Sequence, residues 1–274
     1  MKRSILDISD LQDLAPQLKN ERGAKILKFL SKIYRLDDIN ALYGRHCDLR
    51  GVDFVNAIID DLDITCHIDH EERLDNLPEG SFITVSNHPF GALDGVILIK
   101  MMAQRRPDYK VMVNWILTYI EAMSDNFIAV DPHATHRDIS LNGIRGALQQ
   151  VKDGHPLGFF PAGAVSKLGW DFRIKDREWQ SNIIRLIRQM KKPVLPIFFH
   201  GHNSLAFTII GIFSWQLRAL RLPVEVFKKE HKTIHISIGE LISPDILKQY
   251  QTDEELGRFL RQETDKLRNS GTRR

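Results

Sequence analysis

Two residues that could act as a proton-transfer pair lie close together in NHPFGALD, residues 87–94. Imidazole titrates near neutral pH, so His88 could take the proton of a hydroxyl group as its oxygen attacks a thioester carbonyl. A carboxylate on the other ring nitrogen fixes the tautomer and stabilises the imidazolium, and Asp94 could supply it. Along one regular helix this spacing would turn the two side chains about 120° apart. The chain must therefore turn between them, which Pro89 and Gly91 allow.

Small residues follow a second apolar run in LGFFPAGAVSK, residues 157–167. The run passes through Pro161 and Ala162 to Gly163. Backbone without bulky side chains can approach a ligand closely, and free N–H groups there can hold an anion or an oxyanion. An ordinary exit from a strand into a loop would have the same composition.

A third segment, VLPIFFHGHNS (residues 194–204), is typical of a buried strand that opens into a polar turn. His200 and His202 alternate as two metal ligands on one strand would. Gly201 is expected to interrupt that strand, however, and no third ligand stands nearby in the sequence. We therefore expect no metal site here, and expect these histidines to bond to the backbone of the turn.

Alternating patterns predict the elements that position these segments. After residue 60, β-type runs alternate with amphipathic helical stretches, which predicts an α/β fold with a central mixed, largely parallel sheet flanked by helices. Ligand sites of such sheets lie where strands end and loops begin. The expected strands are residues 63–68, 81–86, 109–113, 127–130, 157–160, 194–199, 224–227 and 233–238. The expected helices are residues 91–103, 115–123, 138–152, 181–190, 244–250 and 252–268.

Residues 1–60 are expected to form an N-terminal helical segment ahead of an α/β domain at residues 61–274. Residues 22–36 place apolar side chains at helical spacing among lysines and arginines, which indicates a basic amphipathic helix. This helix could pack on the core, or it could rest on an anionic lipid surface. A second apolar helix, at residues 205–215, could be a core helix or could face a membrane or an acyl chain.

Composition limits the class of protein. The chain has 274 residues and is 43% hydrophobic, which is enough for a full core. Its net charge of +3 is compatible with an anionic membrane surface and does not indicate a nucleic-acid partner. Cys47 and Cys66 form neither a disulfide framework nor a metal motif, and are expected to be reduced thiols. The most apolar stretch, residues 193–217, is interrupted by prolines, glycines and histidines, so no membrane span is expected.

Taken in this order, the three segments resemble the glycerolipid acyltransferase family, whose best-known members acylate lysophosphatidic acid. That family has an Asn-His-x4-Asp block, a Phe-Pro-Glu-Gly-Thr-Arg-Ser block and a hydrophobic strand with a proline, which here read NHPFGALD, FPAGAVS and VLPIFF. The resemblance covers roughly residues 65–240 and implies an acyl donor (acyl carrier protein or acyl-coenzyme A), a lipid acceptor at a membrane surface, and no cofactor. His88 and Asp94 then become the catalytic pair. The remaining expected substrate-binding residues are Asn87, Gly91, Phe160, Pro161, Ala162, Gly163, Ser166, Arg137 and Lys167.

The sequence departs from the family at positions that concern the acceptor. The interval between His88 and Asp94 is one residue longer, Ala162 replaces a Glu, and Val165 replaces an Arg. The intervening block FIAVD ends in Asp131, where an Arg usually helps to hold the acceptor phosphate. Because the guanidinium fork suits phosphate, these losses favour a different acceptor. Nearby cations that could substitute are Arg137, Lys167, Arg173 and Lys175.

The altered blocks look like the branch of the family found in bacterial aminolipid synthesis, of the ornithine-lipid or glycine-lipid type, in which a lyso-aminolipid hydroxyl is acylated. Asp131 would suit an acceptor amine, although a turn residue before Pro132 explains it more simply. We therefore expect a cytoplasmic acyltransferase, peripheral on the inner face of the cell membrane. The alternatives are a 1-acyl-glycerol-3-phosphate acyltransferase, a thioesterase, and a non-catalytic lipid-binding protein on the same fold.

Overall fold

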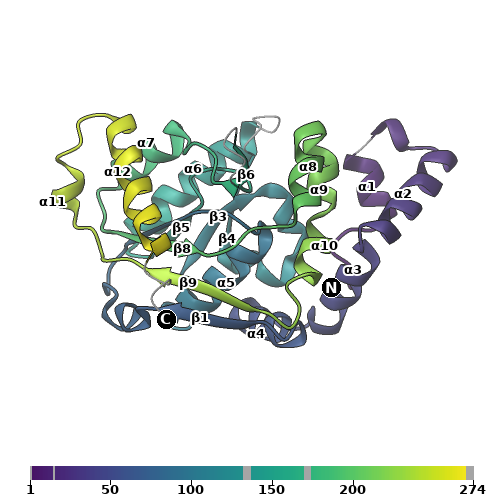
Figure 1. Cartoon of the computed structure of the whole chain (residues 1–274), viewed down its shortest axis with the longest axis horizontal. Helices are drawn as coiled ribbons and strands as arrows, with labels where there is room; N and C mark the ends of the chain where they lie inside the picture. Colours follow the sequence, from purple (N-terminus) through teal and green to yellow (C-terminus); the bar gives the residue numbers. More distant parts are fainter. Residues whose placement is uncertain (1, 15, 132–136, 170–173, 270–274) are drawn as a thin grey trace.

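A seven-stranded sheet forms the centre of the computed structural model, with helices on both of its faces (Figure 1). The structure describes residues 2–14, 16–131, 137–169 and 174–269. The strand order is β1-β9-β8-β2-β5-β3-β4. The strands are β1 (Thr65–Asp69), β2 (Ile83–Ser86), β3 (Lys110–Asn114), β4 (Phe127–Val130), β5 (Leu157–Phe159), β8 (Val194–Phe199) and β9 (Thr233–Ile238), with a separate hairpin of β6 (Lys167–Leu168) and β7 (Ile174–Lys175).

The sheet is mixed and largely parallel, as expected. Strands β8, β2, β5, β3 and β4 run parallel, β9 is antiparallel to β8, and β1 is parallel to β9. Every residue of β2 and β8 is buried. Strand β8 is accordingly a continuous apolar run, whereas β2 also buries the polar side chains of Thr84 and Ser86. Because the central strands are parallel, their carboxyl ends meet at one edge, and the loops after β2, β5 and β8 come together there.

The helices divide between the two faces. They are α1 (Ile8–Leu14), α2 (Glu21–Ile33), α3 (Leu36–His46), α4 (Gly51–Asp61), α5 (Ala92–Ala103), α6 (Arg137–Lys152), α7 (Ser181–Met190), α8 (Leu205–Phe213), α9 (Trp215–Leu220), α10 (Leu222–Phe227), α11 (Pro244–Leu247) and α12 (Asp253–Lys266). Helices α3, α4 and α5 share one apolar core with the sheet, and α6, α7 and α12 build a second.

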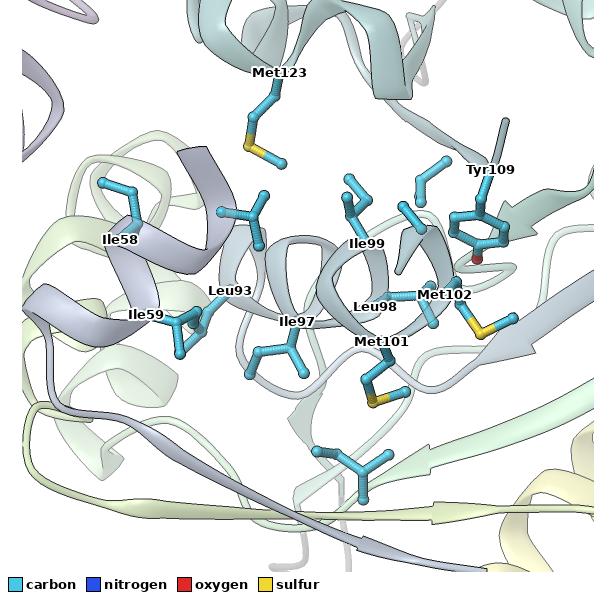
Figure 2. Close-up of a cluster of buried hydrophobic side chains, with 14 of the residues drawn as sticks. Ile58, Ile59, Leu93, Ile97, Leu98, Ile99, Met101, Met102, Tyr109 and Met123 are labelled. Carbon is cyan, nitrogen blue, oxygen red and sulfur yellow. The ribbon is translucent and has the colours of Figure 1, made fainter. Parts of the chain in front are cut away.

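Helix α5 is the most buried helix of the first core (Figure 2). Its side chains Ile97, Leu98, Ile99, Met101 and Met102 pack on several sides at once. A helix that is apolar on all sides is held rigidly by its surroundings. The start of α5, directly after residues 87–91, is therefore a fixed platform for that loop.

Two of the predicted elements are wrong. Residues 224–227 form the end of helix α10, because Pro223 lies in its first turn, where proline suits a helix, and Glu225 points inward. The Glu225 carboxylate accepts hydrogen bonds from the backbone N–H (2.8 Å) and the hydroxyl (2.6 Å) of Ser204, the N-cap of α8. Residues 115–126 form two short 3-10 segments, Trp115–Tyr119 and Glu121–Asn126, instead of one α-helix.

Candidate active site

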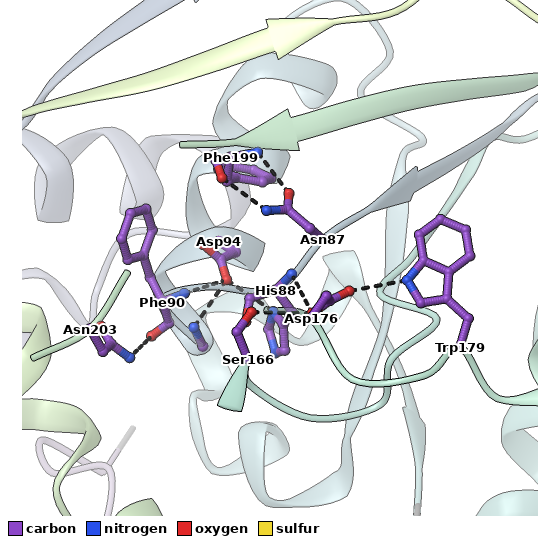
Figure 3. Close-up of polar contacts among 10 residues, drawn as sticks. Asn87, His88, Phe90, Asp94, Ser166, Asp176, Trp179, Phe199 and Asn203 are labelled. Atoms are coloured by element: carbon purple, nitrogen blue, oxygen red, sulfur yellow. Dashed lines mark hydrogen bonds and ion pairs between the residues drawn. The ribbon is translucent and has the colours of Figure 1, made fainter. Parts of the chain in front are cut away.

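His88 lies in the loop between the end of β2 and the start of α5, at the carboxyl edge of the sheet (Figure 3). Its side chain is 17% exposed, and its ring packs on the ring of Phe160, with 4.4 Å between centroids. The histidine is therefore held on one side by an aromatic ring and still reaches open space, which a proton-transfer residue requires.

Asp94 stands in the first turn of α5 and is completely buried. Its Oδ2 lies 3.0 Å from His88 Nδ1, and the same oxygen accepts hydrogen bonds from the backbone N–H groups of Phe90 (2.9 Å) and Gly91 (3.0 Å). The chain thus turns between His88 and Asp94, with Gly91 at a φ of +88°. The histidine N–H is not aligned on this oxygen as a full hydrogen bond, a looseness common in ligand-free sites.

Burial raises the pKa of the Asp94 carboxyl, whereas His88 and the two backbone N–H groups favour its charged form. The second oxygen, Oδ1, is buried and has no hydrogen-bond partner among the described residues. A charged Asp94 therefore carries a desolvation cost, which His88 and the two backbone N–H groups oppose. Such an arrangement is typical of sites whose charge serves a reaction.

A second carboxylate holds the backbone of His88. Asp176 Oδ1 accepts hydrogen bonds from the His88 N–H (3.3 Å) and the Ser166 hydroxyl (3.2 Å), and its other oxygen accepts one from the Trp179 indole (3.0 Å). The Ser166 N–H in turn donates to the His88 carbonyl at 2.9 Å. Burial raises the pKa of Asp176. Sequence reasoning missed Asp176, because a single acid in an irregular loop gives no signal.

The Asn87 amide joins two strand ends. It donates to the Phe199 carbonyl (2.9 Å) and accepts from the Phe199 N–H (2.8 Å), so it bridges the ends of β2 and β8. Both ends of the amide are thus occupied within the protein. We propose that Asn87 orients the His88 loop rather than contacting substrate.

The residues after β5 form the opposite wall of the site. The Pro161 carbonyl accepts a hydrogen bond from Gln180 N–H (2.9 Å), and Ala162 is buried. Gly163 has a φ of +65°, and its N–H donates to the Phe160 carbonyl at 2.9 Å. This N–H is therefore bonded within the protein, and the role of Gly163 in substrate binding stays a prediction. A side chain at position 163 would also collide with Gln180.

The expected basic residues do not gather at the site in the part of the chain that the structure describes. Lys167 is exposed on β6, directly opposite Lys175 of the antiparallel strand β7. Arg137 is the first residue of α6, but its side chain, like all of Arg173, lies outside the described residues. His200 Nε2 contacts the Ser237 hydroxyl (2.8 Å) rather than backbone, and His202 Nδ1 contacts the Asn203 carbonyl (2.8 Å).

A cavity of about 300 Å³ lies beside His88. Its wall is mainly apolar, with polar groups of Asn114, Ser140 and Asp131 at its margin. Asp131 is buried there, and its backbone exchanges hydrogen bonds with the Ser140 hydroxyl (3.2 and 3.0 Å). A mostly apolar cavity next to a histidine is suited to a ligand with a hydrocarbon portion. Apolar residues that line it include Val96, Met112, Val113, Leu117, Ile120 and Phe127.

The family match identifies this chain as an acyltransferase. Residues 10–272 match the acyltransferase family, so the chain belongs to that family. It aligns with the crystal structure of the 1-acyl-sn-glycerophosphate (LPA) acyltransferase PlsC from Thermotoga maritima, with a TM-score of 0.55 and 16% identity, over 90% of this chain and 89% of that one. This likeness confirms the α/β fold.

The curated relatives are more specific. A lyso-glycine lipid O-acyltransferase of Bacteroides thetaiotaomicron is 30% identical over 227 residues, 79% of this chain and 80% of the relative. A protein of the same description from Phocaeicola vulgatus is 27% identical over 288 residues, 97% and 100% of the two chains. The resemblance to the aminolipid branch of PlsC-like acyltransferases is thereby confirmed.

Asp94 allows a test of stability that does not depend on any substrate. Because burial raises its folded-state pKa, the native protein binds a proton more tightly than the unfolded chain, so native stability falls as pH rises above about 3.8. In Asp94→Asn this fall of stability with pH is absent, because the asparagine side chain does not ionise. We expect its melting temperature to equal or exceed that of the unaltered protein by up to about 4 °C at neutral pH. The gain should shrink toward pH 4. A variant that melts clearly lower at pH 7 would contradict this account.

Proposed function

We propose that this acyltransferase moves a fatty acyl chain from a thioester donor to the hydroxyl group of a lyso-aminolipid of the glycine-lipid type. The observation that carries the proposal is the His88–Asp94 pair beside the apolar cavity. The names of the two curated relatives support the acceptor. A non-catalytic lipid-binding protein would have no use for a buried carboxylate next to a histidine.

In the proposed reaction, Asp94 holds His88 through Nδ1, which leaves Nε2 for the acceptor. The acceptor hydroxyl gives its proton to Nε2 as its oxygen attacks the thioester carbonyl. The carbon–sulfur bond then breaks, and the thiolate takes the proton from the imidazolium. No acyl group is attached to the protein. The donor is acyl carrier protein or acyl-coenzyme A.

An acceptor comparison tests this function. Purified protein is given labelled acyl-acyl carrier protein or acyl-coenzyme A together with lyso-glycine lipid, lysophosphatidic acid or no acceptor. We expect transfer to lyso-glycine lipid, and a fall of at least about 10³-fold in His88→Ala, because general-base catalysis is lost. Preferred transfer to lysophosphatidic acid would support the phosphate-acceptor alternative. Fatty acid release at the same rate without acceptor would identify a thioesterase.

We propose that the cavity beside His88 holds the acyl chain of the donor. Gly95 lines it from α5, and a Cβ atom added there would make only ordinary contact, 3.9 Å from Phe160. Larger side chains would therefore extend into the cavity without straining the backbone.

Gly95→Leu should shorten the accepted chain. We expect kcat/KM for a 16-carbon donor to fall about tenfold relative to an 8-carbon donor, because the side chain displaces hydrocarbon. Gly146→Leu, on the exposed side of α6, is the matched control and should leave this ratio unchanged. Equal effects of Gly95→Leu on both donors would place the chain elsewhere.

We propose that the protein binds the membrane surface through α2 and α8. Phe213 at the end of α8 is 83% exposed, and Phe29 of α2 is 65% exposed. Each belongs to a group of exposed apolar residues, and those of α2 lie among its lysines, a pattern suited to anionic lipid. In Figure 1 both helices lie in the half of the molecule that carries the N-terminal helices, α2 at its end and α8 nearer the middle. No helix among the described residues is long and apolar enough to cross a membrane. The exposed residues are Ile26, Phe29, Ile33, Leu205, Ile209, Ile212 and Phe213.

Vesicle binding tests this surface. In co-sedimentation with phosphatidylglycerol-containing vesicles, Ile212→Glu/Phe213→Glu should bind at least about tenfold more weakly, because two apolar side chains no longer enter the lipid. Leu241→Glu, which alters an exposed leucine ahead of α11, should bind normally. Equal binding by the double variant and the control would exclude α8 from the membrane contact.

A further inference from the structure

Arg218 of α9 is a buried cation that has no anionic partner among the residues that the structure describes. It is 8% exposed, its guanidinium carbon lies 5.6 Å from the centre of the Phe207 ring, and Gly211 leaves room for its side chain. Among the residues that the structure describes, its guanidinium makes no hydrogen bond or ion pair. Arg221, three residues further along the chain, does have an anionic partner, because its Nε lies 3.4 Å from the Glu225 carboxylate.

A second arginine lies next to the residues that hold His88. Arg177 follows Asp176, and its Nε donates to the Val165 carbonyl at 3.4 Å. Val165 precedes Ser166, whose N–H donates to the His88 carbonyl. Helix α8, which Arg218 covers, packs on strand β6 directly after this loop. Burial lowers the pKa of Arg218, and the positive charge of Arg177 lowers it further to a smaller degree. The two guanidinium groups therefore repel each other.

This region meets the start of α5. A Cβ atom at Gly91 would lie 3.3 Å from Val165 and 2.8 Å from Leu222, the first residue of α10. The loop of Val165 and the start of α10 therefore close over Gly91, which precedes α5. Neither arginine is among the residues that line the apolar cavity. Both arginines thus lie outside the proposed acyl-chain cavity, and Arg177 directly follows Asp176, which holds the backbone of His88.

Within the described residues neither guanidinium group forms an ion pair, and the buried Arg218 therefore lacks the counter-charge that a buried cation needs. An anion with two oxygens would supply it, since the guanidinium fork matches such a group. We propose that Arg218 and Arg177 bind the carboxylate of the acceptor lipid. This inference rests on the proposed function: a glycine whose nitrogen is in an amide keeps one free carboxylate. A lipid phosphate shares the anionic-oxygen chemistry and is the alternative source.

The test measures acceptor preference at a saturating acyl donor. The acceptors are lyso-glycine lipid, its neutral glycinamide analogue, and lysophosphatidic acid. The protein should prefer the carboxylate to the amide. Arg218→Gln should raise KM for the carboxylate acceptor about 10- to 100-fold with kcat nearly unchanged, and should abolish the preference over the amide. Arg177→Gln should act in the same direction. Arg258→Gln, on exposed α12, is the control.

The outcomes separate this inference from the proposed function. If the protein acylates lyso-glycine lipid but Arg218→Gln has an unchanged KM and the same preference, the carboxylate site is wrong and the function stands. A KM effect only with lysophosphatidic acid would assign the site to phosphate and overturn the inference. If lyso-glycine lipid is not acylated at all, the function fails, and the site is judged by binding.

Binding is measured as thermal stabilisation by N-octanoylglycine and by its amide. The unaltered protein should be stabilised by the carboxylate only, and Arg218→Gln by neither. Arg218→Lys, which keeps the charge without the fork, provides a second variant and should be stabilised less than the unaltered protein. Equal stabilisation of the unaltered protein and Arg218→Gln by N-octanoylglycine would overturn the inference.

Discussion

The buried Asp94 carboxylate is the constraint on which the rest of the site depends. Its charged form is favoured by the backbone N–H groups of Phe90 and Gly91, just before α5, and by His88, which lies 3.0 Å away. That geometry needs a rigid helix start, which the apolar core around α5 provides. It also needs the strand ends to be fixed, which Asn87 achieves by bridging β2 to β8. Stability elsewhere in the fold offsets the local cost of this charge.

Around this pair the protein arranges environments of different polarity. An apolar cavity lies beside His88 on the α5–β3 side, whereas Arg177 and Arg218 lie outside that cavity, toward α8 and α9. Exposed apolar side chains of α8 continue from this cationic region to the surface. A lipid acceptor that enters from a membrane could thus keep its chains in lipid while its polar head reaches the buried Arg218 and the half-buried Arg177. The proposed reaction requires this order of hydrocarbon, charge and base.

The sequence predicted those parts of the molecule that local pattern determines. Buried parallel strands are continuous apolar runs, so the core strands were predictable, and His88, Asp94 and Gly91 were visible as a block. Residues 224–227 were wrongly predicted as a strand, because their apolar and polar residues alternate. They form a helix, which Pro223 in the first turn and the contact of Glu225 with Ser204 stabilise. Asp176 and Arg218 could not be found, because their roles come from tertiary contacts. The sequence offers substitute cations at residues 137–175, whereas the proposed carboxylate site uses Arg177 and Arg218.

The most direct test of the account is the acyl-transfer rate of Asp94→Asn, measured on protein shown by its melting curve to be folded. The asparagine preserves size and can still accept the backbone N–H bonds, but it cannot stabilise a positively charged His88. The account predicts a kcat lower by about 10³- to 10⁴-fold with little change in KM. A folded Asp94→Asn protein with nearly full kcat would show that the His88–Asp94 pair does not carry the reaction.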